Sequence, residues 1–87
     1  MSRVLKYPAP IAAELVIDMP EVAHVLSVQV QRGQAQIWAL VHDDGSHKPR
    51  TFLWIGTGHT VPEPIGAYVG SVQFDGGALV FHLFEAA

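Results

Sequence analysis

The residues best suited to bind a ligand lie in one short segment: Gly56, Thr57, Gly58, His59 and Thr60. Its two glycines allow the backbone to approach a ligand closely and to present N–H groups, which is how phosphates are cradled. The two threonines and the histidine add side-chain donors. The segment lacks the Gly-x4-Gly-Lys pattern and the following helix of a Walker loop, so a bend at the end of a strand is the alternative interpretation.

Lys48 and Arg50 are the closest pair of basic residues in the chain. They precede the glycine-rich segment by one strand, so we expect them at the other end of that strand. Within one chain they are then distant from His59, whereas a second copy could bring them near it. We therefore predict a ligand site formed by Lys48, Arg50 and residues 56–60.

The histidines show no spacing typical of a metal site, such as His-x-His or His-x3-His. The nearest pair, His42 and His47, encloses two aspartates, which favours a polar hairpin tip over weak metal binding. We predict no metal and no other cofactor. The five histidines are His24, His42, His47, His59 and His82.

Catalysis has little support in the sequence. There is no cysteine nucleophile and no Gly-x-Ser-x-Gly elbow. The three serines after Ser2 are scattered, and no Ser-His-Asp set has a spacing argument behind it. We predict that the chain is not an enzyme.

Alternation of apolar and polar residues predicts strands. Residues 12–19 fit either a helical turn or a strand, and the β-branched pair Val16 and Ile17 favours a strand. Residues 24–32 show the period of two most clearly. Their apolar members, which we expect on the buried face, are Leu26, Val28 and Val30.

Turn-forming residues divide the strands. Residues 32–34 and 75–77 predict hairpin turns, residues 43–49 predict a hairpin tip, and residues 56–66 form the longest loop. Residues 35–42 and 50–55 are apolar on both faces, so both faces must be covered. We predict an all-β fold, a small sandwich or open barrel. Its seven or so short antiparallel strands are expected at residues 4–7, 12–19, 24–32, 35–42, 50–55, 68–74 and 78–84.

The 87 residues suffice for one domain, which we place at residues 1–87. Only 15 % of residues are charged whereas 49 % are hydrophobic, so few charges remain to cover the apolar strands. This favours a homo-oligomer over a self-contained monomeric sandwich. The aromatic residues fit a core, or a surface for a base or a protein. The net charge of −3 argues against general nucleic-acid binding, and no apolar run predicts a membrane span or targeting signal.

The chain resembles a family of short proteins of unknown function encoded by tailed phages and prophages. The resemblance rests on Lys6-Tyr7-Pro8, on Gly56-Thr57-Gly58-His59 and on the run from Gly76 to Glu85, and it covers nearly the whole chain. It implies a small non-virion phage protein in the bacterial cytoplasm. It carries over no catalytic or binding residue.

We therefore expect a non-enzymatic binding protein that neutralises a host defence factor. It would either mask a protein surface, as many anti-CRISPR proteins do, or act as a sponge that sequesters a nucleotide signal. The alternatives are a structural or virion-accessory protein and a small His-dependent enzyme.

Overall fold

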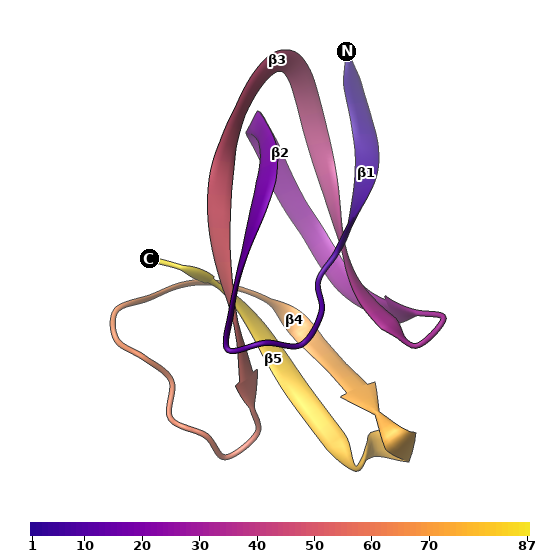
Figure 1. Cartoon of the computed structure of the whole chain (residues 1–87), viewed down its shortest axis with the longest axis vertical. Coiled ribbons are helices and arrows are strands. Elements are labelled where there is room, and N and C mark those ends of the chain that lie inside the picture. The colour runs from indigo at the N-terminus through magenta and orange to yellow at the C-terminus, as the bar shows by residue number, and fades with distance from the viewer.

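The computed structural model describes the backbone of residues 1–87 and the side chains of residues 1–42 and 45–87. It consists of one antiparallel sheet (Figure 1), which confirms the expected all-β class. A 3-10 turn at residues 75–77 joins the last two strands, where a hairpin turn was predicted. The elements are β1 (Ser2–Pro8), β2 (Glu14–Gln31), β3 (Gln34–Gly56), β4 (Ile65–Phe74), η1 (Asp75–Gly77) and β5 (Leu79–Ala86).

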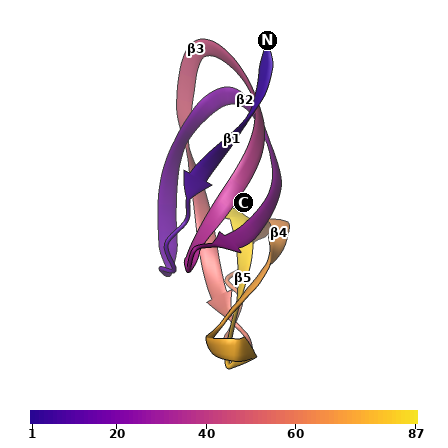
Figure 2. The ribbon, with the colours of Figure 1, turned by 90° about the vertical axis from the view of Figure 1, so that its right-hand side faces the viewer.

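Strands β2 and β3 form one long hairpin that is bent into an arch (Figures 1 and 2). Its turn is Arg32-Gly33, where φ is 53° and 77°, so both central residues adopt the left-handed backbone of a two-residue hairpin turn. The pairing of Gln31 with Gln34 agrees with the predicted hairpin. Residues 12–19 fit either a helical turn or a strand by sequence, and in the structure they belong to strand β2 from Glu14 onward.

The predicted hairpin tip at residues 43–49 is wrong, because β3 continues through it. The register passes from Pro20 opposite His47 to Val22 opposite His42, so the four residues 43–46 of β3 face only Glu21 of β2. Where a two-stranded ribbon bends, the strand on the longer path needs extra residues, and an irregularity of this kind supplies them. The polar, glycine-containing segment therefore forms the top of the arch.

The bend divides the sheet into two layers. The first contains β1, the first half of β3 and the second half of β2; the second contains the remaining halves of β2 and β3 with β5 and β4. The layers enclose one core, so the sheet is a curled half-barrel, the open-barrel form of the prediction. The long strands β2 and β3 each contain two of the seven predicted segments. The most buried side chains of the core include Val28, Ile37, Phe52, Val72 and Leu83.

A β-bulge corrects the predicted facing of residues 24–32. The register shifts between Val25 and Ser27, so Leu26 is the extra residue and lies on the outside, 54 % exposed. Val28 is buried as expected, whereas Val30 is 38 % exposed near the turn. A period of two does not reveal where one residue is inserted, and the insertion reverses the side of every residue before it.

Each layer has an outer face that points away from the shared core. We call the outer face of the first layer the N-face and that of the second layer the C-face. Cross-strand pairs define both, because directly paired residues share a face. The N-face includes Val4, Lys6, Val22, Leu26, Trp38 and Leu40. The C-face includes Glu14, Val16, Asp18, Leu53, Tyr68 and Phe84.

We expect Gly66→Ala to lower the free energy of unfolding by about 1–3 kcal/mol. A Cβ at Gly66 would collide with the carbonyl oxygens of Glu85 and Ala86, which belong to the backbone of β5 and cannot turn aside. Gly56→Ala is the matched control, because there the Cβ would come 3.0 Å from the ring of His59, an exposed side chain that can turn away. Urea unfolding of both variants measures the difference. Equal loss at the two positions would contradict the close backbone approach at Gly66.

Candidate functional site

The glycine-rich segment leaves β3 as a turn held against β5. The Thr57 amide donates to the Val80 carbonyl oxygen at 3.1 Å, and the His59 amide donates to the Gly56 carbonyl oxygen at 3.0 Å. Gly58 has a φ of 87°, in the left-handed region that glycine tolerates. Two of the amides that a phosphate cradle would use are therefore engaged within the protein itself.

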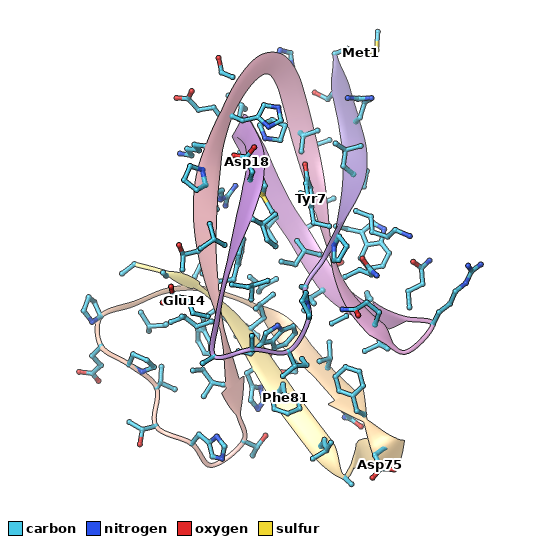
Figure 3. All side chains as sticks on the ribbon, in the orientation of Figure 1. Met1, Tyr7, Glu14, Asp18, Asp75 and Phe81 are labelled. Carbon is cyan, nitrogen blue, oxygen red and sulfur yellow. The ribbon has the colours of Figure 1, made fainter. Side chains whose placement is uncertain are left out.

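A groove of about 350 Å³ adjoins this turn, lined by Gly56, Thr57, His59 and residues 78–81. The imidazole of His59 lies over Gly56, where a Cβ would come 3.0 Å from Nδ1, so the glycine makes room for the ring. No Lys or Arg is among the described residues that line the groove. Phe81, labelled in Figure 3, also lines a second, mainly apolar groove of about 460 Å³ beside Phe74.

A chain of hydrogen bonds extends from the predicted turn across the C-face. Thr57 Oγ1 lies 2.8 Å from His82 Nε2, His82 Nδ1 lies 2.7 Å from Ser71 Oγ, and Ser71 Oγ is bonded to the Tyr68 hydroxyl. Thr57 Oγ1 is also 3.3 Å from the Val80 carbonyl oxygen, to which it can only donate. With that direction, Thr57 Oγ1 accepts from His82 Nε2.

No sequence pattern indicates this array, because its members are separated along the chain. Ser71 and His82 are directly paired residues of β4 and β5, so only the strand register brings them together. A contact between serine and histidine is the beginning of a nucleophile–base pair. In this array both nitrogens of His82 are bonded to hydroxyl groups, so the contacts join β4 and β5 to the turn after β3.

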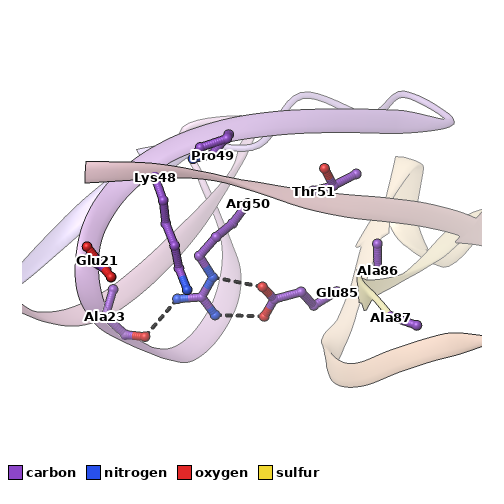
Figure 4. A pocket seen from close by; sticks show the side chains of 9 residues that line it. All are labelled: Glu21, Ala23, Lys48, Pro49, Arg50, Thr51, Glu85, Ala86 and Ala87. Carbon is purple, nitrogen blue, oxygen red and sulfur yellow. Dashed lines mark hydrogen bonds and ion pairs between the residues drawn. The ribbon is translucent and has the colours of Figure 1, made fainter. Parts of the chain in front are cut away.

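Arg50 lies away from the turn and joins three strands (Figure 4). Its Nε and Nη2 donate to the two carboxylate oxygens of Glu85, both at 2.7 Å, and its Nη1 donates to the Ala23 carbonyl oxygen at 2.7 Å. We call this arrangement the Arg50 clasp. Hydrogen bonding to Glu85 raises the pKa of Arg50, although burial opposes it. The guanidinium is thus committed to β2 and β5.

Lys48 and Arg50 share a cavity of about 480 Å³ with Glu21 and Glu85 (Figure 4). Arg50 is paired with Ile17 of β2, whereas Gly56 is paired with Phe81 of β5, so the cations and the turn lie at different ends of this half of β3, as expected. Residues 56–60 are brought together as one turn. The structure does not bring Lys48 and Arg50 to it within one chain.

The remaining candidate groups are distributed over the surface and the core. Within the described side chains, no three His, Asp or Glu residues gather as a metal ion would require. The predicted tip between His42 and His47 includes residues 43 and 44, whose side chains lie outside the described part. Among the tryptophans, Trp54 is buried in the core and Trp38 is half-buried on the N-face.

These observations define a small all-β protein built on one curled sheet. The chain belongs to the family described as Domain of unknown function (DUF7352), whose model matches residues 1–87. No curated protein and no solved structure matches the chain. Among the described residues, no helix is long and apolar enough to cross a membrane.

Proposed function

We propose that the chain is a non-enzymatic, homo-oligomeric binding protein of phage origin that neutralises a host defence factor in the bacterial cytoplasm. The observation that supports it is the exposure of large apolar side chains on both outer faces. Val4 is 54 %, Leu26 54 %, Val16 60 % and Tyr68 57 % exposed. Apolar residues gathered on a small sheet are typical of surfaces that meet another protein. Phage origin rests on the resemblance described above.

Of the two mechanisms, masking a protein surface has the better support. Sequestering a nucleotide needs positive charge or free N–H groups around its phosphates. The Arg50 guanidinium is bonded to Glu85, and the described lining of the groove beside His59 includes no Lys or Arg. An apolar face needs no such charge to bind a protein.

Plating efficiency tests the proposal. Phage plated on bacteria that carry a defence system should form more plaques when this chain is expressed. The control is the Trp54→Ala variant, which removes a core side chain and should not protect. A panel of defence systems on which wild type and control plate equally would contradict the proposal, and recovery of the chain in purified virions would favour a virion-accessory role.

Nucleotide sequestration remains the second candidate, because the turn and the groove beside His59 adjoin. Calorimetry with cyclic nucleotides and cyclic ADP-ribose variants tests it, and heating should release the ligand unchanged. If His59 donates to a phosphate, His59→Ala should weaken binding by about 1–3 kcal/mol. Unchanged affinity would remove His59 from the site. Chemical conversion of the ligand would instead support a His-dependent enzyme, with Ser71→Ala as the variant that tests the Ser71–His82 contact.

A further inference from the structure

The two outer faces carry opposite charges. On the N-face, the described outward-facing residues include Lys6 but no Asp or Glu. On the C-face they include Glu14 and Asp18 but no Lys or Arg, and Asp18 Oδ2 lies 3.3 Å from Nδ1 of His47. Lys6 donates one hydrogen bond to Gln31 at 2.7 Å, which leaves two ammonium hydrogens for a partner. In a chain with a net charge of −3, the side chains described for the N-face thus include a cation and no carboxylate.

Each face also carries an apolar cluster beside its charges. On the N-face, Leu40 is flanked across the sheet by Val4 and His24, and Leu26 projects from the bulge beside this row. On the C-face, Glu14, Leu53, Phe84 and Tyr68 form one cross-strand row. Tyr68 meets Phe84 edge to face at 5.3 Å between ring centroids, which gives this row a defined shape.

The arrangement favours contact between unlike faces. Two N-faces brought together would bring two copies of Lys6 into one interface with no described carboxylate, and two C-faces would bring their carboxylates into one interface with no described Lys or Arg. Like charges in an interface are costly. An N-face against a C-face joins cation to carboxylates and apolar cluster to apolar cluster. Because the inner sides of both layers pack on one core, the two faces point away from each other (Figure 1). One copy can therefore bind two others.

We propose that the N-face binds the C-face of a second copy, so that the chain assembles head to tail into a ring or a filament. Such a contact is heterologous, and it closes or extends according to the rotation between copies. This contact would be the interface of the homo-oligomer proposed above. Only the existence of that homo-oligomer rests on the proposed function. A filament leaves one N-face and one C-face uncovered at its two ends, and these are the faces that remain for a host protein.

Mixing two variants tests the head-to-tail contact. Leu40→Glu places a carboxylate in the apolar cluster of the N-face, and Val16→Lys places an ammonium between Glu14 and Asp18 on the C-face, where it would oppose Lys6. Each should weaken self-association about tenfold or more. Sedimentation velocity of the wild type should show species larger than a dimer. Each variant alone should sediment as a monomer, whereas their equimolar mixture should form a heterodimer that grows no further.

The alternatives give different patterns. Isologous pairing of N-faces would leave Val16→Lys dimeric, and isologous pairing of C-faces would leave Leu40→Glu dimeric. Either result overturns the proposal, as does a monomeric wild type. Circular dichroism checks that both variants fold, and Val4→Glu replaces Leu40→Glu if the latter unfolds, since Val4 is 54 % exposed. The sedimentation measurements use purified protein alone. A negative result would therefore reject the head-to-tail contact, whereas the plating experiment tests the proposed binding function independently.

Discussion

Replacing Arg50 by methionine should lower the free energy of unfolding by about 2–3 kcal/mol. Removing one partner of a buried ion pair costs about 3–5 kcal/mol, and the side chains of Arg50 and Glu85 are 15 % and 25 % exposed, so solvent reduces that figure. The variant leaves the Glu85 carboxylate without its bidentate partner and the Ala23 carbonyl oxygen without its donor. The loss is large because the clasp joins β2, β3 and β5.

Urea unfolding of Arg50→Met, Glu85→Gln and the double variant measures the coupling between the two side chains. Lys48→Met is the matched control, because Lys48 lines the same cavity but is exposed, and its loss should stay within about 0.5 kcal/mol. An Arg50→Met variant as stable as this control would refute the clasp and return Arg50 to the candidate ligand residues. Since Glu85 raises the pKa of Arg50, the clasp should persist from neutral into alkaline pH and be lost only above the ordinary pKa of arginine.

Trp54→Ala should be the most damaging single substitution, with a loss of about 3–5 kcal/mol. Trp54 is 5 % exposed, and its indole Nε1 donates to the Ala9 carbonyl oxygen at 3.2 Å. The Ala9 amide in turn donates to the Ala35 carbonyl oxygen at 2.9 Å. The indole thus fills the core and secures the connection between β1 and β2 to both layers.

Two controls separate volume from hydrogen bonding. Trp54→Phe keeps an aromatic ring of smaller volume but leaves the buried Ala9 carbonyl oxygen without its donor, so we expect a loss of about 1–3 kcal/mol. Trp38→Ala removes the same side chain from the half-buried N-face and should cost clearly less than Trp54→Ala. Thermal unfolding ranks the three variants. If Trp38→Ala proves as damaging as Trp54→Ala, the division into core and outer face is incorrect.

The strand positions could be predicted because their signals are local. The period of two at residues 24–32, the turn chemistry of Arg32-Gly33 and the glycines at 76 and 77 depend on neighbours in the sequence, and each is found where expected. The arch was not predicted, since a polar segment with a glycine serves equally for a hairpin tip and for a bend in a ribbon. The bulge at Leu26 was not predicted either, because a bulge is a property of the pairing between two strands and not of one segment.

The sequence by itself determined an all-β domain with more apolar surface than its few charges can cover, because composition and periodicity act residue by residue. Tertiary structure decided what the functional candidates do. Register brought Ser71 to His82, and the folding of the sheet brought Glu85 to Arg50, from positions 11 and 35 residues apart. The same folding separated Lys6 from Glu14 and Asp18 onto opposite faces. Long-range pairing sets these distances, and no local pattern along the chain encodes them.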